Sequence, residues 1–396
     1  MHVYVDNAAT TKMSRTAIDA MLPYMETYYG NPSSLHSVGQ AAAEALQAAR
    51  NTIAQALGCE ARELIFTSGG SEADNQALLS AARLGNKKGK KHLISTRFEH
   101  HAILHTLKKL EEEGFDVTLL DVHENGIVSA EDVASAIRED TALVSIMYAN
   151  NEIGTIQPIA EIGKVCRERG VLFHTDAVQA AGHIHIDVKA QNIDLLSLSA
   201  HKFHGSKGTG VLYARKGIIL SSVIEGGAQE RGKRAGTENV PAIVGMAAAF
   251  AESCARIDAY TKTLTPLREQ LIEGLLQIPH SALNGDRTQR LPGTVNLCFE
   301  GIEGEALLLL LDQKGIYAST GSACASGSLD PSHVLLAIGR PHEVAHGSLR
   351  LSLSEENTQE DVEYLLDVIP EVVSYLRNMS PAWRDLCEGK KPFILK

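Results

Sequence analysis

The chain has 396 residues, of which 44% are hydrophobic and 21% are charged. This length and composition allow a large buried core and predict two or three domains. The net charge of −11, from 37 basic and 48 acidic residues, argues against nucleic acid or an anionic membrane surface as the main partner.

The sequence carries no clear membrane or secretion signal. Its longest apolar run, from Ala306 to Leu311, is too short to span a bilayer. The N-terminus begins with strand-like residues 2–5 and has no basic, apolar leader, which argues against secretion. We therefore expect a soluble, cytoplasmic protein with neither a membrane nor a nucleic acid as partner.

Short apolar strands alternate with helices along the first two thirds of the chain. The expected strands lie at 2–5, 64–66, 92–95, 117–120, 142–149, 171–174, 195–198 and 211–213. The expected helices lie at 14–26, 40–57, from about 71 to 84, 101–113, 130–138, 159–169 and 241–259, the last continuing to 276. This alternation predicts an α/β fold with a mainly parallel sheet and helices on both faces.

The remainder of the chain has a different pattern. Strands are expected at 294–299 and 348–352, and helices at 303–314 and 359–376. This suits a smaller α+β domain, to which the N-terminal strand could return. We therefore predict a large domain of residues 14–257 and a small domain of residues 1–13 and 258–396.

A lysine stands at the end of one buried strand. The apolar run 195–198 breaks at Ser199 into a polar segment that contains Lys202, and a glycine-rich turn at 205–210 follows. An amine among neighbours that disfavour its charge can act as a nucleophile and form a Schiff base. An ordinary exposed lysine is the commoner case, so this stretch needs support from the rest of the chain.

A glycine-rich turn joins the strand 64–66 to the next helix. A strand, a glycine-rich turn and a helix N-terminus form an anion site, because free backbone N–H groups and the helix dipole both favour phosphate. The segment 67–75 matches neither a dinucleotide nor a Walker motif, so nucleotide binding is not favoured. The alternative is a capped turn, with Ser71 as the N-cap.

Polar residues follow five successive strands. In parallel sheets, ligands gather beyond the carboxyl ends of the strands. Each residue alone could be a cap or a turn residue, but their accumulation favours one shared site. The candidates are Gly70, Ser71, His100, Asn151, Asp176, Gln179, Ser199, His201 and Lys202.

The six cysteines are scattered and form no close pairs, which fits neither a disulfide framework nor a metal motif. Five of them suit buried or incidental thiols. Cys324 differs because it lies in a segment of small residues, about 319–331, that we expect to be a mobile, exposed loop. Packing explains such a cysteine poorly and reactivity explains it well.

These motifs together resemble a known family. They are Asp6–Thr11, Gly30–His36, Glu99-His100, Asn150–Gly154, Ala200–Lys202 and Gly321–Cys324. The lysine, aspartate and histidine resemble those of type I, aminotransferase-like pyridoxal-phosphate enzymes, and the cysteine segment narrows the likeness to the group I (NifS- and IscS-like) cysteine desulfurases. The resemblance covers nearly the whole chain and implies a large domain with a mainly parallel seven-stranded sheet.

The resemblance implies a role for each candidate. Lys202 would bind pyridoxal 5'-phosphate as a Schiff base and act as a base, Asp176 would pair with the ring nitrogen, His100 would stack on the ring and Gln179 would bond its phenolic oxygen. Asn151, also near the cofactor, and Arg350 would hold the substrate. The phosphate would rest on Gly70, Ser71, Ser199, His201 and Thr237, the last from the facing subunit of a homodimer.

By the same resemblance, Cys324 would take sulfur from L-cysteine as a persulfide and release L-alanine. The sulfur would pass to an acceptor protein, either an iron–sulfur scaffold or a thiolation enzyme. No metal site is expected. Two positions depart from the family pattern: Gly70-Ser71 replaces the usual Ala-Thr, and Thr320 replaces the commoner Ser.

Three other functions compete with this one. A selenocysteine lyase or an aminotransferase would keep Lys202 and Asp176 but would not need Cys324. A non-catalytic sulfur- or metal-binding scaffold would use Cys324 with histidines, but no ligand spacing recurs among the 16 histidines. An inactive relative is a third alternative, although every chemical position is filled.

Overall fold

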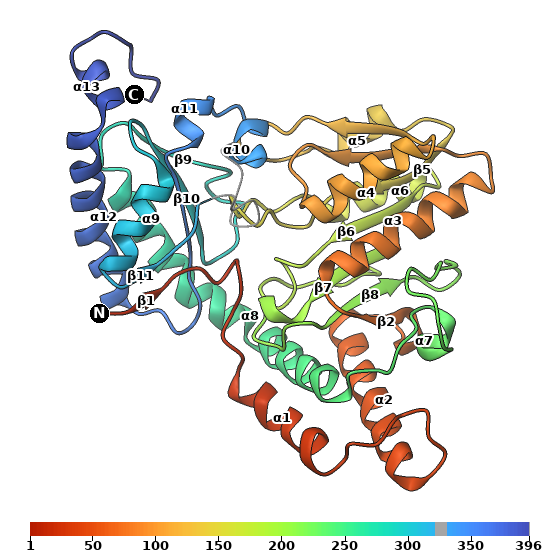
Figure 1. Cartoon of the computed structure of the whole chain (residues 1–396). Helices are drawn as coiled ribbons and strands as arrows, with labels where there is room; N and C mark the ends of the chain where they lie inside the picture. Colours follow the sequence, from red (N-terminus) through yellow and green to blue (C-terminus); the bar gives the residue numbers. More distant parts are fainter. Residues whose placement is uncertain (321–330, 396) are drawn as a thin grey trace.

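A seven-stranded sheet forms the centre of the larger part of the molecule (Figure 1). The computed structural model describes residues 1–320 and 331–395. The strand order is β2-β8-β7-β6-β5-β3-β4, and β8 alone runs against its neighbours. The strands are β2 (Leu64–Thr67), β3 (His92–Thr96), β4 (Asp116–Leu120), β5 (Thr141–Ser145), β6 (Leu172–Asp176), β7 (Leu195–Ser199) and β8 (Gly210–Ala214). The predicted, mainly parallel seven-stranded sheet is confirmed.

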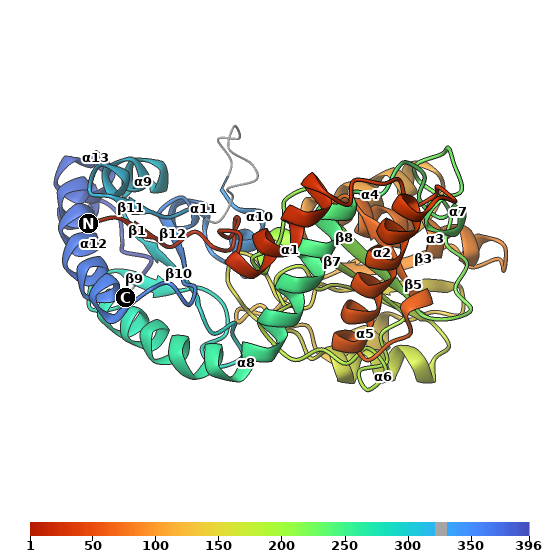
Figure 2. The same ribbon diagram turned by 90° about the horizontal axis from the view of Figure 1, so that it is seen from below.

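Helices cover both faces of this sheet, and every strand except the edge strand β4 is buried along almost its whole length. On one face α3 and α4 pack against β3, β5, β7 and β8, and on the other α2, α5, α6 and α8 close a second core. Figure 2 shows α4 and α6 on opposite sides of the sheet. These helices are α2 (Ser37–Leu57), α3 (Gly70–Asn86), α4 (His101–Glu112), α5 (Ala130–Ala136), α6 (Ile159–Glu168) and α8 (Val240–Leu275).

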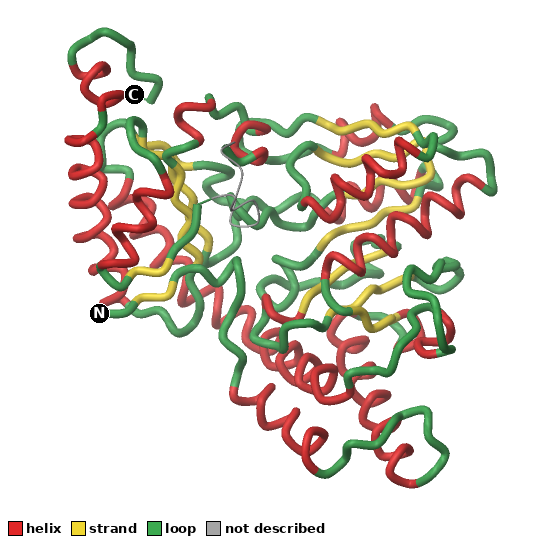
Figure 3. Tube along the Cα trace, viewed as in Figure 1, coloured by secondary structure: helices red, strands yellow, loops and turns green. Residues whose placement is uncertain are grey.

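A second, three-stranded sheet lies at the other end of the molecule. The antiparallel strand order is β12 (Ser348–Ser352), β10 (Thr294–Phe299), β9 (Ser281–Leu283), covered by α9 (Gly304–Gln313) and α12 (Gln359–Met379). The N-terminal strand β1 (Val3–Tyr4) pairs in parallel with β11 (Ile316–Tyr317), so the start of the chain does return here. Loops occupy the region between the two sheets (Figure 3).

The long helix α8 connects the two parts. It packs against α1 (Arg15–Glu26) and α2 at one end and against α12 at the other. Within the described ranges it is the one helix long and apolar enough to cross a membrane, but half of its most apolar stretch is buried inside the protein, as in a core helix. The predicted domains, 14–257 on one side and 1–13 with 258–396 on the other, stay a prediction; α8 runs through residue 258 without a break.

Some local predictions need correction. The strand predicted at 142–149 ends at Ser145, and residues 146–149 are buried outside any strand. The N-cap position of α3 is Gly69, not Ser71, which lies inside the first turn. The short strands β9 and β11 were not predicted. Short helical elements that were not predicted are η1 (Ala61–Glu63), η2 (Ala200–Lys202), α7 (Gln229–Gly232), α10 (His333–Ala337), α11 (His342–Ala345) and α13 (Pro381–Cys387).

Candidate active site

A cavity of about 390 Å³ lies beyond the carboxyl ends of the parallel strands. Its lining includes most of the candidates, from elements far apart in the sequence: Gly70, Ser71, His100, Asn151, Asp176, Gln179, Ser199, His201, Lys202 and Arg350. Thr237 is exposed and outside this lining. Cys324 lies outside the described residues.

The fold explains how these side chains meet. Asp176 is the last residue of β6, Lys202 follows β7 in η2, and His100 is the N-cap of α4 just after β3. These three therefore project from one edge of the large sheet. Arg350 comes from β12 of the other sheet, so the cavity lies between the two parts of the molecule.

The N-terminal segment fixes the position of the Lys202 amine. Its Nζ donates hydrogen bonds to the carbonyl oxygens of Ala8 at 2.5 Å and Ala9 at 2.7 Å. The Gln179 amide also donates to the Ala8 carbonyl, and Thr11 donates to the His201 carbonyl. Backbone carbonyls have no side-chain signature, so sequence reasoning did not anticipate that this segment would hold the lysine.

Asp176 is a buried carboxylate that suits a cationic ring nitrogen. Only 5% of it is exposed, and its Oδ1 accepts a hydrogen bond from the Val178 N–H at 2.9 Å. Burial raises its pKa to about 6, against the opposing effects of that hydrogen bond and of the Lys202 charge. A cation placed against it would favour the ionised form further.

His100 is a neutral imidazole at neutral pH. Burial, followed by the charges of His101 and Lys202, lowers its pKa to about 4. Its Nδ1 accepts a hydrogen bond from the Ala102 N–H at 3.1 Å, so the proton of the neutral ring is on Nε2. A neutral, fixed imidazole can stack against an aromatic ring.

The turn between β2 and α3 forms a cradle that only small residues permit. Gly69 has φ +152°, and a Cβ at Gly70 would lie 2.7 Å from Cγ2 of Val178. The first turn of α3 therefore approaches the cavity closely with its backbone N–H groups, beside Ser71 and Ser199. This arrangement fits the phosphate of pyridoxal phosphate.

Arg350 is placed to bind a carboxylate. Its Nη2 contacts Oδ1 of Asp6 at 2.8 Å, its Nη1 donates to the Asn151 carbonyl at 3.0 Å, and its buried Nε has no hydrogen-bond partner within the described structure. Each Nη carries a second N–H that these two bonds do not use, so the guanidinium keeps donors for a substrate carboxylate in the cavity that Arg350 lines.

If Arg350 binds the substrate carboxylate, as the resemblance implies, its replacement with lysine should raise the KM for L-cysteine about 10- to 100-fold and change kcat much less, because a single ammonium group cannot form the two parallel bonds of a guanidinium. Steady-state kinetics of alanine release measure both constants. Arg287→Lys, at a partly exposed arginine outside the cavity, is the matched control. A lower kcat at unchanged KM would show that Arg350 has another role.

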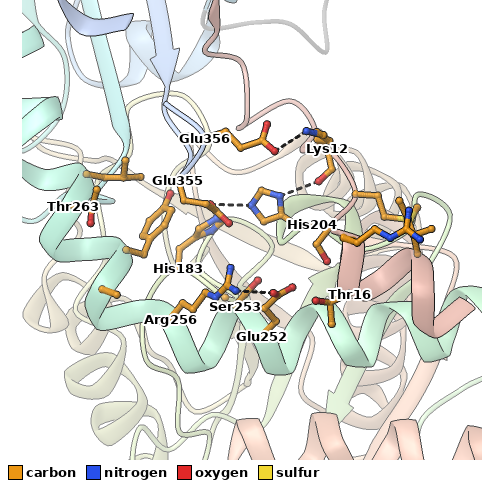
Figure 4. A pocket seen from close by; sticks show the side chains of 18 residues that line it. Lys12, Thr16, His183, His204, Glu252, Ser253, Arg256, Thr263, Glu355 and Glu356 are labelled. Carbon is orange, nitrogen blue, oxygen red and sulfur yellow. Dashed lines mark hydrogen bonds and ion pairs between the residues drawn. The ribbon is translucent and has the colours of Figure 1, made fainter. Parts of the chain in front are cut away.

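A second cavity, of about 670 Å³, is lined by α1, α8 and the segments around Lys12, His183, His204 and Glu355 (Figure 4). The candidate residues are absent from its lining. The His204 ring contacts the Glu355 carboxylate at 3.3 Å and the Lys12 carbonyl at 2.9 Å, while the Lys12 amine pairs with Glu356 at 2.8 Å. These contacts connect the segment after Lys202 with the segment after β12.

The His204–Glu355 pair should make stability depend on pH. Burial alone would lower the His204 pKa, but the bond and charge of Glu355 raise it above 6.5, whereas the same pair lowers the Glu355 pKa to about 2. The contribution of His204 is lost as pH rises through its raised pKa, and that of Glu355 is lost as pH falls from about 4.5 towards 2. The pair therefore stabilises most between about pH 4.5 and 6.5.

We expect His204→Asn to lower the free energy of unfolding more at about pH 5.5 than at about pH 8.5. Asparagine suits this position because His204 has φ +63°. Urea unfolding at both pH values measures the difference. His185→Asn removes an exposed pair with Asp258 and should show little such pH dependence. An equal loss at both pH values for His204→Asn would contradict the prediction.

The fold and the cavity together define a type I pyridoxal-phosphate enzyme, with a lysine, an aspartate, a histidine and an anion cradle at one site. The aminotransferase class-V family matches residues 3–365. A cysteine desulfurase IscS of Methanosarcina thermophila is 58% identical over 96% of this chain and 94% of its own, and one of Clostridium botulinum is 54% identical over 98% of each chain. A solved NifS-like protein has a TM-score of 0.89 and 39% identity, over 95% of this chain and all of that one.

The chain belongs to the cysteine desulfurases of the aminotransferase class-V family. The predicted family, fold class, pyridoxal-phosphate cofactor and desulfurase function are confirmed. The roles of the individual site residues stay predictions. Asp74 and Met147 also line the cavity and were missed, since Asp74 lies inside α3 and Met147 fell within the predicted strand 142–149.

Proposed function

We propose that this cysteine desulfurase works through the cavity between the two sheets, with each candidate residue in the role that the resemblance implies. One observation carries the proposal: side chains from both sheets line the same cavity of about 390 Å³. Pyridoxal phosphate, when bound, supplies an electron sink for the carbon atoms of the substrate.

Each residue of the cavity has a proposed role that suits the chemistry of its side chain. The Lys202 amine would hold the cofactor through its aldehyde, and as a base it would move a proton at the substrate α carbon. The ionised Asp176 carboxylate would accept a hydrogen bond from the protonated ring nitrogen, and Gln179 and His100 would orient the ring. The α3 cradle, with Ser199 and His201, binds the phosphate. Arg350, with Asn151, binds the substrate carboxylate.

Sulfur leaves the substrate through Cys324. The C–S bond of L-cysteine breaks, an S–S bond to the Cys324 sulfur forms, and the substrate carbon gains a proton, so the products are a persulfide and L-alanine. The atoms balance without an external oxidant or reductant. Cys324 lies outside the described residues, and its role follows from the family resemblance and from the reaction.

We propose an iron–sulfur scaffold or a thiolation enzyme as the sulfur acceptor. Two relatives carry the name cysteine desulfurase IscS, which supports the class but does not choose the partner. Intact-mass measurement after incubation with L-cysteine tests the proposal: the enzyme should gain one sulfur atom, and a purified scaffold or thiolation enzyme should then gain it. Sulfur that stays on the enzyme with every such acceptor would contradict this proposal. A cytoplasmic location remains a prediction.

We propose a homodimer in which Thr237 binds the phosphate in the partner's cavity. Its exposure and its position outside the cavity of its own chain support this arrangement. Exposed apolar side chains at Met25, Tyr28 and Tyr29, in or after α1, offer a surface for a second copy. The dimer should have twice the chain mass of 42.6 kDa.

Mixing two inactive or weakened variants tests the shared site. In a mixed dimer of Lys202→Ala and Thr237→Ala chains, one site combines an intact Lys202 with an intact Thr237 from the other chain. We expect that site to bind the cofactor as tightly as wild type. If Thr237 served its own chain, no site in the mixed dimer would be complete and mixing would restore nothing.

A further inference from the structure

The segment from Ser221 to Thr237 is held near both of its ends by one buried side chain of α3. The Gln76 amide donates hydrogen bonds to the carbonyl oxygens of Ser221 at 3.0 Å and of Lys233 at 2.7 Å. Gln76 is fully buried, so these bonds are shielded from water. Because the first turn of α3 forms the phosphate cradle, the segment that carries Thr237 is tied to the helix of that cradle.

A strained turn in this segment has a fixed conformation. Glu230 and Arg231, in α7, are non-glycine residues in the left-handed region, with φ of +48° and +57°. The buried Glu230 carboxylate holds the turn, since it accepts hydrogen bonds from Arg50 of α2 at 2.8 Å and 2.5 Å and from the Phe66 N–H of β2 at 2.9 Å. The chain that leads to Thr237 is therefore anchored on α2 and β2 as well as on α3.

Arg234, three residues before Thr237, joins this segment to the cradle itself. Its Nε donates a hydrogen bond to Oε1 of Glu72 at 3.0 Å, and its Nη2 donates one to Oε2 at 3.3 Å. Glu72 follows Ser71 in the first turn of α3, and its Oε2 also accepts a hydrogen bond from the Ser68 N–H at 2.8 Å. One carboxylate therefore bonds both to the turn that forms the cradle and to the segment that carries Thr237.

Arg234 also neutralises a charge that would oppose phosphate binding. The Glu72 side chain is 9% exposed and that of Arg234 is 22% exposed. Burial alone would raise the pKa of Glu72, but its bonds with Arg234 and Ser68 lower it below its usual range, so the carboxylate is ionised at neutral pH. An unpaired carboxylate beside the cradle would repel a phosphate, and the guanidinium offsets that repulsion.

We propose that Arg234 is a positioning residue that serves two cofactor sites of the homodimer. Through Glu72 it holds the phosphate cradle of its own chain, and through the backbone up to Thr237 it sets the position of the hydroxyl that binds the phosphate in the partner's cavity. The inference rests on the homodimer and on the role proposed for Thr237. It assigns no contact between Arg234 and the cofactor or the substrate.

Mixed dimers separate the two effects, because borohydride fixes a pyridoxyl group only where Lys202 is intact. In the first arrangement an Arg234→Gln chain pairs with a Lys202→Ala chain, so the intact Lys202 lies beside an altered cradle. In the second, a wild-type chain pairs with a Lys202→Ala/Arg234→Gln chain, so only the incoming Thr237 is altered. Each site loses about one hydrogen bond to a charged group, so pyridoxal phosphate should bind about tenfold more weakly in each arrangement than in a dimer of wild-type and Lys202→Ala chains.

Two further variants complete this experiment. Arg234→Lys keeps a cation beside Glu72 and should weaken binding in both arrangements by a smaller factor. Arg256→Gln, which removes the pair of Arg256 and Glu252 at 3.0 Å on α8, is the matched control and should leave both affinities unchanged. Wild-type affinity in either arrangement, with Arg234→Gln or, if that chain does not fold, with Arg234→Lys, would overturn the proposal.

Hydrogen exchange of the cofactor-free, full-length enzyme detects the link independently of the cofactor. In Arg234→Gln the amides of residues 228–237 should exchange at least about tenfold faster than in wild type, whereas those of α12 should not change. Equal exchange of residues 228–237 in the two proteins would also overturn the proposal. If wild type bound no pyridoxal phosphate, the proposed function would fail, while the exchange rates would still decide whether Arg234 holds this segment.

Discussion

Lys202→Ala should lower the release of alanine from L-cysteine at least about a thousandfold, since the variant loses both the amine that binds the aldehyde and the base that moves the α proton. The structure places this amine 2.5 Å and 2.7 Å from the carbonyl oxygens of Ala8 and Ala9. Among the described residues no other lysine lines the cavity, so none can replace it. Steady-state alanine release measures the loss.

One further variant separates the reactivity of the Lys202 amine from its positive charge, and a second variant is a control. Lys202→Arg keeps a cation but cannot bond to an aldehyde, so it should be as inactive as the alanine variant. Lys207→Ala removes an exposed lysine five residues away and should keep wild-type activity. Borohydride treatment should fix a pyridoxyl group on wild type and on Lys207→Ala only. A fixed pyridoxyl group on the Lys202→Ala chain would refute the assignment.

Sequence reasoning could find those site residues whose position is indicated by the residues directly around them in the sequence. Lys202, Asp176 and His100 each lie at or within a few residues of the end of a buried strand, and the carboxyl ends of parallel strands meet at one edge. An alternation of strands and helices could therefore predict both the sheet and the location of the cavity. The predicted end of the helix 40–57 also agrees with the structure, in which Gly58 is the C-cap of α2 in the left-handed conformation.

Other parts have no local signal. Arg350 comes from the second sheet, about 150 residues beyond Lys202, and only the family resemblance singled it out. Asp74 lies inside a helix, where one inward-facing carboxyl in a polar stretch reads as an ordinary helix residue. The Ala8 and Ala9 contacts are made by backbone carbonyls. The strand predicted at 142–149 was too long, because the apolar run continues into residues 146–149, which are buried in the core without being part of a strand.

Cys324→Ser should abolish the persulfide and lower the release of sulfide and alanine at least about a thousandfold, while the enzyme keeps its bound cofactor. A serine hydroxyl is too weak a nucleophile to take up sulfur, whereas the variant leaves the described lining of the cavity unchanged. The cofactor absorption and a borohydride-fixed pyridoxyl group should therefore match wild type. This combination separates a desulfurase from an aminotransferase or a selenocysteine lyase, neither of which needs the thiol.

The other cysteines are poorly suited to replace Cys324. Burial raises the pKa of Cys59 and Cys166 to about 12 and that of Cys254 and Cys298 to about 11, so these four are thiols rather than thiolates at neutral pH. Cys387 is exposed at the end of α13, which makes Cys387→Ser the matched control; it should keep the persulfide and the activity. Intact mass after incubation with L-cysteine reads the sulfur directly. Alanine and a sulfur-loaded chain from Cys324→Ser would exclude this residue as the sulfur carrier.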